Sequence, residues 1–167
     1  MTPLKVVYDS FFNQITDDMY LEISEEETKR DCFGLLLGSL PLFEFPRKII
    51  RLTQDEFGET SFSRDLTLEE INILATGMLI IWLQRQITSV ELTRQKYTGA
   101  DFKMTSQASH LSKLMALLSA TKDEHRRLQM LDSRREIDEN NEEYVSTFYK
   151  LVKRMSPSYP YQRRNFR

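Results

Sequence analysis

The sequence has few of the residues that usually build catalytic and metal sites. Its 167 residues include a single cysteine, Cys32, and two histidines, His110 and His125. One cysteine excludes a disulfide within the chain and favours a reducing compartment. The histidines and the cysteine are not spaced as zinc ligands or as members of a nucleophilic triad. We therefore expect no catalytic residues, no metal and no cofactor, and we predict that the protein is not an enzyme.

Long apolar runs and a strong charge of one sign are also missing. The most apolar stretch, residues 71–83, is interrupted by polar side chains and is shorter than the roughly 20 residues that cross a bilayer. The first dozen residues lack the pattern of a signal peptide. The formal net charge of −2 provides no basic field that would hold nucleic acid. We expect a soluble protein, made in the cytoplasm, whose partners are other proteins.

What the sequence does contain is a series of signals that begin helices. The motifs SEEE at 24–27 and TLEE at 67–70 match the capping box, in which two side chains satisfy free N–H groups of the first turn. Thr2 followed by Pro3 fits an N-cap with proline at the first helical position, and a third capping pattern begins at Thr88. Together with the apolar spacing, these signals predict helices over residues 3–15, 25–40, 71–87, 88–97, 106–135 and 144–155.

Residues 44–65 interrupt this helical pattern. The β-branched stretches 48–53 and 60–63 flank turn-rich residues, which predicts a projecting β-hairpin or a long loop. With 40% hydrophobic and 29% charged residues, the chain has the composition of one folded domain. We predict a mostly α protein, a helical bundle of about four to six helices with a β-hairpin or long loop insertion and an extended C-terminal tail. The helical domain covers residues 1–155 and the tail covers 156–167.

Structural roles are the simpler interpretation of several residues that could otherwise suggest chemistry. His125 falls near the inward stripe of the 106–135 helix, which favours a hydrogen-bonded structural histidine over a metal ligand or a base. Cys32 lies on an apolar helix and is expected to pack as a small hydrophobic residue. Gly34 and Gly38 favour close helix packing or local bending over a specific dimer seam, and the acidic runs are typical of solvated helix starts. The inward stripe consists of Leu111, Leu114, Leu118 and Leu128.

The C-terminal segment differs in composition from the rest of the chain. From Lys150 onward there are six basic residues and no acidic one, and aromatic residues alternate with arginines in the tail. Arginine and tyrosine are enriched in protein interfaces, and they also suit the backbone and bases of nucleic acids. The prolines equally permit a disordered end. Protein docking, disorder and nucleic-acid binding therefore stay open as roles for the tail.

Six segments follow one another in a characteristic order between residues 24 and 131. They are SEEE at 24–27, LLLGSLP at 35–41, LTLEEINILA at 66–75, WLQRQI at 82–87, LTRQ at 92–95 and FKMTSQASHL at 102–111. In order and spacing this series resembles the small head-to-tail adaptor (neck or connector) proteins of tailed bacteriophages that infect Gram-positive bacteria. The last thirty or so residues do not clearly match that family.

The resemblance implies a structural protein of the virion neck, made in the host cytoplasm. Copies of such an adaptor form a homo-oligomeric ring, usually of twelve, beneath the portal protein. The ring extends the DNA channel, joins the capsid to the tail, and carries the next neck or tail-completion protein. Contact with genomic DNA would be transient and non-specific, and no membrane is involved. The alternative function is a nucleic-acid-binding or DNA-packaging accessory module that uses the basic C-terminal tail.

The resemblance also implies which residues meet partners. The 44–65 hairpin is expected to line the channel or meet the next ring, and the C-terminal helix and tail are expected to dock into the portal. A ring contact needs two complementary patches on each subunit, for which the acidic run 136–143 and the basic tail are candidates. The expected channel or next-ring residues are Lys48, Arg51, Phe57 and Phe62. The expected docking residues are Tyr144, Phe148, Tyr159, Tyr161, Arg163, Arg164, Phe166 and Arg167.

Overall fold

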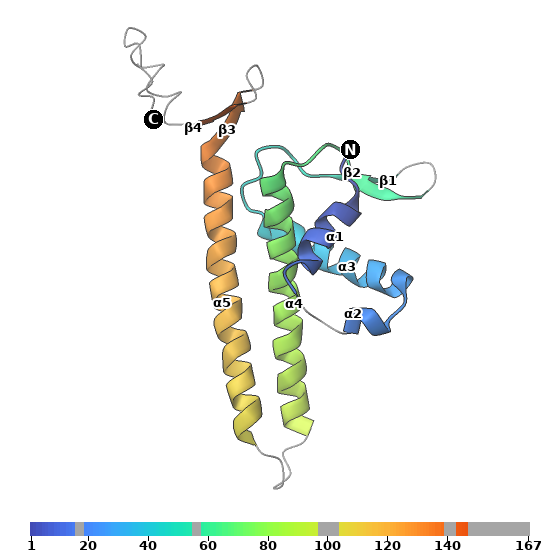
Figure 1. Ribbon diagram of the computed structural model, residues 1–167, viewed down its shortest axis with the longest axis vertical. Helices are drawn as coiled ribbons and strands as arrows, with labels where there is room; N and C mark the ends of the chain where they lie inside the picture. Colours follow the sequence, from blue (N-terminus) through green and yellow to red (C-terminus); the bar gives the residue numbers. More distant parts are fainter. Residues whose placement is uncertain (16–18, 55–57, 97–103, 139–142, 147–167) are drawn as a thin grey trace, which may run out of the picture.

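The structure is a computed structural model, which describes residues 1–15, 19–54, 58–96, 104–138 and 143–146. Two long antiparallel helices stand side by side, and two of the three shorter α-helices, the first and the third, lie against the first long helix (Figure 1). This architecture confirms the predicted mostly α fold with a small hairpin insertion. The elements are α1 (Leu4–Phe12), α2 (Met19–Glu22), α3 (Glu25–Ser39), the 3-10 turn η1 (Leu40–Leu42), β1 (Leu52–Gln54), β2 (Thr60–Phe62), α4 (Leu68–Lys96), α5 (Met104–Arg134), β3 (Arg135–Asp138) and β4 (Glu143–Ser146).

Both predicted capping boxes are present. At the start of α3, the Glu27 N–H donates to Ser24 Oγ at 3.3 Å, and the Ser24 N–H donates to Glu27 Oε2 at 3.1 Å. At the start of α4, the Glu70 N–H donates to Thr67 Oγ1 at 3.2 Å, and the Thr67 N–H donates to Glu70 Oε2 at 3.0 Å. Each box satisfies two backbone donors that the helix itself leaves free.

The start of α1 differs from the prediction. Pro3 is the N-cap and makes no side-chain cap, so the helix begins at Leu4. The Thr2 hydroxyl instead accepts a hydrogen bond from the Leu66 N–H at 2.9 Å. Thr2 was wrongly assigned as the cap, because its hydroxyl joins the N-terminus to the segment that precedes α4.

The helix α4 is continuous where a break was predicted. The pattern at Thr88 suggested a second helix start, but α4 runs through it to Lys96. The Thr88 hydroxyl donates to the Gln84 carbonyl at 3.0 Å, so it is satisfied by the preceding turn and caps nothing. The predicted end of this helix, at residue 97, lies outside the described residues.

By length and composition alone, α4 could cross a membrane. Its segment Leu68–Leu92 reaches a mean hydropathy of 1.2 over a window of which 44% is buried inside the protein. Ile73, Leu74 and Met78 lie in that segment and belong to the core formed with α1 and α3. The packing of the protein is therefore one sufficient reason for the apolar character of α4.

Glycines let α3 and α4 approach closely. A Cβ added at Gly77 of α4 would lie 2.9 Å from the Ser39 Cβ of α3, and one at Gly38 would lie 3.4 Å from Ile81. The first distance is well inside the roughly 3.5–4.0 Å at which carbon atoms normally meet. The predicted close packing at Gly38 is confirmed. Cys32 of the same helix is fully buried, and this burial, together with the nearby Asp31, raises the pKa of its thiol to about 12.

The insertion forms a short antiparallel hairpin in which Leu52 of β1 pairs with Phe62 of β2. The Phe62 N–H donates to the Thr2 carbonyl at 3.0 Å, which ties β2 to the N-terminus. The Phe62 side chain has no exposed surface and lies in the core with α1 and α4. Its assignment to a channel or next-ring surface was wrong, because a side chain that fills the core is not available to another molecule.

After α5 the chain continues as a two-stranded ribbon, β3–β4. Tyr144 lies in β4, so the predicted helix over residues 144–155 was wrong at its start. Tyrosine and valine at positions 144 and 145 favour strands, and pairing with β3 outweighs the helical spacing of the apolar residues. Residues 147–155 and the predicted tail, 156–167, lie outside the described residues.

Candidate functional site

The inner face of α5 is polar in the C-terminal part of the helix. The predicted leucine stripe is buried only at Leu111, while its other members are partly buried. The remaining buried side chains are polar, and their spacing of four, four and three residues places them on one helix face. Only the histidine of this set was predicted from the sequence, although the helical spacing of all four residues was a usable signal. The set consists of Thr121, His125, Gln129 and Asp132.

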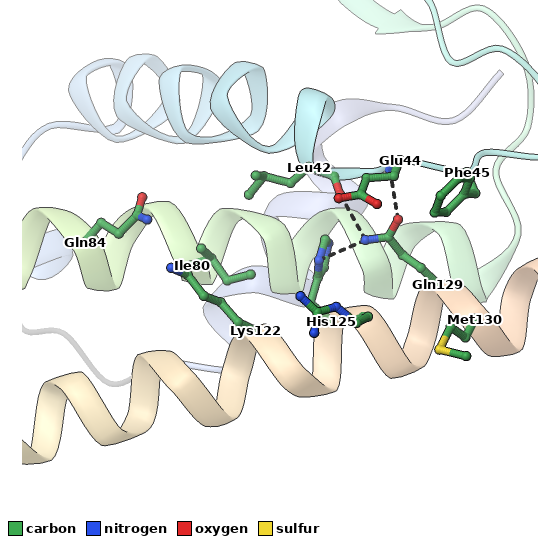
Figure 2. A pocket seen from close by; sticks show the side chains of 10 residues that line it. Leu42, Glu44, Phe45, Ile80, Gln84, Lys122, His125, Gln129 and Met130 are labelled. Carbon is green, nitrogen blue, oxygen red and sulfur yellow. Dashed lines mark hydrogen bonds between the residues drawn. The ribbon is translucent and has the colours of Figure 1, made fainter.

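Gln129 binds the segment that follows η1 to α5. Its Oε1 accepts from the Glu44 N–H at 2.8 Å, and its Nε2 donates to the Leu42 carbonyl at 2.9 Å. The same Nε2 lies 3.0 Å from His125 Nδ1 (Figure 2). One amide therefore satisfies a backbone donor and a backbone acceptor that would otherwise be costly to bury.

The hydrogen bond from Gln129 determines the state of His125. Because the Gln129 amide nitrogen is a donor, His125 Nδ1 acts as the acceptor and the ring is neutral, with its proton on Nε2. Burial lowers the pKa of His125, while the Ile73 backbone and the Glu44 carboxylate act in the opposite direction. The contact with Gln129 thus fixes the imidazole between α4 and α5, which is a structural role.

Two ion pairs fasten the neighbouring loops to the helix ends. Arg47 contacts Asp132 at 2.6 Å, and Asp132 is almost completely buried. Arg64 contacts both carboxylate oxygens of Glu70, at 2.6 and 2.7 Å. Burial alone would raise the pKa of Glu70, but the hydrogen bonds from Arg64 and from the Thr67 N–H, with the nearby arginine charges, lower it overall.

An open cleft lies beside the buried polar residues of α5. It is bounded by α4, α5 and the segment after η1 and has a volume of about 230 Å³ (Figure 2). Phe45 and Met130 line it although their side chains are 65% and 48% exposed. Lys122 and Arg126 of α5 also line it. Exposed apolar side chains beside charged ones are typical of sites that bind a polypeptide.

Of the predicted partner-binding residues, Lys48, Arg51 and Phe62 have described side chains, and none of the three lines this cleft. Lys48 and Arg51 are exposed on the loop before β1, whereas Phe62 is buried. Tyr144 lies in β4, and nothing more is described of its position. The other predicted residues lie outside the described part of the chain: Phe57, Phe148, Tyr159, Tyr161, Arg163, Arg164, Phe166 and Arg167.

Metal ligands are not gathered anywhere within the described ranges. Among these residues, no group of three or more histidine, cysteine, aspartate or glutamate side chains could hold a metal ion. Comparisons of the chain with protein-family models, with curated proteins and with solved structures found no match. The function is therefore inferred from the residues and their geometry.

Proposed function

We propose that this chain is a structural subunit of the neck of a tailed bacteriophage. Copies would form a ring beneath the portal that extends the DNA channel and joins the capsid to the tail. The ordered segments between residues 24 and 131 support this proposal, because they resemble those of neck adaptor proteins. The feature of the structure that supports it best is an uncovered apolar surface on the α4–α5 hairpin.

This surface occupies the half of the hairpin that α1–α3 do not accompany (Figure 1). No residue of α4 between 84 and 92 is buried. Leu92 of α4 and Met115 and Leu117 of α5 are each about half exposed. The exposed α5 positions between 109 and 120 carry mainly serine, alanine, methionine and leucine. Small and apolar side chains on a long hairpin favour packing against a helix of another subunit.

Different partners would contact the loop before β1 and the C-terminal tail. The loop that exposes Lys48 and Arg51 would meet the channel or the next neck or tail protein. The tail over residues 156–167, with its alternating aromatic and arginine residues, would dock into the portal. Genomic DNA would pass through the ring without specific binding, as a net charge of −2 suits.

A truncation tests the portal contact. Heads assembled without this protein are supplied with the full chain, with a chain that lacks residues 156–167, or with a chain whose tail aromatics and arginines are replaced by serine. We expect only the full chain to bind the portal and to yield heads joined to tails in electron micrographs, while both variants stay folded by circular dichroism. Normal portal binding by the truncated chain would remove this assignment.

The six basic residues from Lys150 onward favour a second candidate, an accessory module that binds DNA during packaging. Binding through phosphate contacts weakens steeply as the salt concentration rises. The affinity of the full chain for duplex DNA at low and at physiological salt decides between the two. A steep loss of affinity supports the accessory module, and no binding at low salt dismisses it.

A further inference from the structure

Two backbone groups fix the orientation of the Gln129 amide. The Glu44 N–H can only donate and the Leu42 carbonyl can only accept, so the amide oxygen faces the first and the amide nitrogen faces the second. The remaining N–H of this nitrogen is available to His125 Nδ1, which lies 3.0 Å away. The oxygen and both N–H groups of the amide are therefore committed, and His125 Nδ1 can join this set only as an acceptor without a proton of its own.

A proton on His125 Nδ1 would bring two donors together. The charged ring carries an N–H at both nitrogens, and the Gln129 amide nitrogen also donates, so neither group accepts. The amide could present its oxygen to the ring only by turning over, and this turn would break its bonds to both Leu42 and Glu44. Backbone groups that lose their partner stay unsatisfied at a cost or move into water. Protonation of His125 and the two bonds from Gln129 to the backbone therefore exclude each other.

His125 itself has little room to move. It is only 5% exposed, and its Nε2 lies 3.5 Å from the position that a Cβ on Gly77 would occupy, so the ring is packed against α4. The segment after η1 is neither helix nor strand, and Phe45 within it is mostly exposed. Of the two parts that meet at Gln129, this segment is the one that can move.

The elements around His125 bring charges of both signs. On the segment after η1, the exposed Glu44 carboxylate attracts a charged ring, and solvent screens this attraction. The helix α4 brings the Ile73 backbone, and among its described residues none that lines the cleft is charged. On α5, Lys122 and Arg126 line the same cleft and disfavour another positive charge. Glu44 is therefore the one acidic residue lining the cleft that opposes the effect of the proton.

We propose that His125 and Gln129 form a proton-sensitive latch, in which protonation of His125 releases residues 42–45 from α5 and opens one wall of the cleft. The released segment leads into the β-hairpin insertion, so the latch sets how firmly this insertion is attached at its root. The Arg47–Asp132 pair contains no histidine and remains as a tether further along the segment. The change is therefore local, and the rest of the fold stays closed.

The direction of the response follows from burial. Burial lowers the pKa of His125 in the closed latch, whereas a ring exposed by release of the segment approaches the ordinary pKa of about 6.5. The open state therefore binds a proton more readily than the closed state, and acid favours opening. The latch has its full stability above about pH 6.5 and loses it as the pH falls through the lowered pKa of His125.

Amide hydrogen exchange of the full chain tests the latch between about pH 7.5 and about pH 5, where histidine is the only side chain with an ordinary pKa in range. We expect the protection factor of the Glu44 N–H to fall by up to about tenfold per pH unit below about pH 6.5, the limit for uptake of one proton. The Phe62 N–H, which donates to the Thr2 carbonyl, is the internal reference and should keep its protection. An NMR titration of the His125 ring should show the same pH dependence as the Glu44 N–H.

The two histidines of the chain provide matched variants. His125→Asn keeps an acceptor near the position of Nδ1 but cannot take up a proton, so the Glu44 N–H should stay protected throughout this pH range. His110→Asn, an exposed change on the same helix, should respond to pH as the wild type does. Gln129→Leu removes the latch, so the Glu44 N–H should be poorly protected even at the upper end of the range and should change little with pH.

Three results would overturn the proposal: Glu44 protection that persists after the His125 ring is protonated, a pH response that survives in His125→Asn, or a simultaneous loss of protection at Phe62. The last result would mean that acid unfolds the whole protein. If His125→Asn does not fold, the comparison of the ring titration with Glu44 protection in the wild type decides alone. None of these measurements involves the portal or the tail, so the proposed function is tested separately.

Discussion

The side chains that are buried on the two sides of α4 differ in polarity. Toward α1 and α3 the buried side chains are apolar, as at Ile73, Leu74 and Met78. Toward α5 the buried side chains of the covering helix are mainly polar, including Gln129 and Asp132. Apolar burial is favourable but non-directional, whereas hydrogen bonds weaken steeply when their geometry changes. The first side mainly stabilises the protein, and the second mainly determines where α5 sits.

Removal of an aromatic ring from the apolar side should have the largest effect. We expect Phe62→Ala to lower the free energy of unfolding by about 3–5 kcal/mol, since it leaves a cavity in the core. Phe45→Ala is the matched control, because Phe45 is mostly exposed and should change stability by less than about 0.5 kcal/mol. Urea denaturation of both variants measures the difference. Equal effects would show that Phe62 does not have the buried position described.

Loss of a buried ion pair on the polar side should come next. Asp132→Ala leaves the partly buried Arg47 without its partner, and we expect a loss of about 3 kcal/mol. Glu124→Ala on the same helix removes the exposed partner of Arg127 and should barely change stability. The two thermal denaturation curves provide the comparison. A small effect of Asp132→Ala would mean that the polar side contributes little to holding α5.

Replacement of the Gln129 amide should have an intermediate effect. Gln129→Leu keeps the size of the side chain but removes its hydrogen bonds to Leu42, Glu44 and His125, and we expect a loss of about 1–3 kcal/mol. Gln84→Leu, in the exposed wall of the cleft, is the control and should be nearly neutral. Unchanged stability in Gln129→Leu would indicate that water replaces the amide without cost.

A negative charge at position 129 should change the pKa of His125. Gln129→Glu places a carboxylate beside His125 Nδ1, which favours the protonated ring and should raise the pKa of His125 from its lowered value. The ring resonances of His125 in an NMR titration report this directly, with the exposed His110 as an internal reference. A further fall of the pKa in this variant would show that the new carboxylate does not lie beside the ring.

The smallest effect should be a change in acid sensitivity. The pKa of Glu70 is lower in the folded protein than its ordinary value, so its contribution is complete above about pH 4.3 and is lost as the pH falls through the folded value. The melting temperature should therefore fall with pH below about 4, and less steeply in Glu70→Gln than in wild type. A steeper fall in the variant would mean that the pKa of Glu70 is raised.

Local signals in the sequence predicted much of the fold. The capping boxes at Ser24 and Thr67 involve residues three positions apart, so they could be recognised without knowledge of the tertiary structure. The break predicted at Thr88 failed because the same motif is compatible with the middle of a helix. The strand at Tyr144 was not predicted because apolar spacing alone favours a helix there, whereas the strand depends on pairing with Ile137.

The candidate site was much less accessible to prediction. The bond from Glu44 to Gln129 joins residues 85 positions apart, and no local pattern indicates such a pair. The polar positions on α5 do repeat with a helical period, but apolar residues are the usual signal of a buried face, and on this helix they indicate the leucines. The cleft depends on the long-range bond and on the polar face of α5, because Gln129 belongs to that face and holds the segment that forms one wall of the cleft.

The directional contacts of Gln129 and Asp132 have a consequence for any repeated assembly. A slide of α5 by one turn, about 5.4 Å, would break both sets of contacts at once, whereas leucines could exchange neighbours with little loss. The end of α5, where β3 begins, is thereby held in place relative to the segment after η1. In a closed circle of identical parts, a small angular error in each part accumulates until the last cannot meet the first, so such precision would determine whether the circle closes.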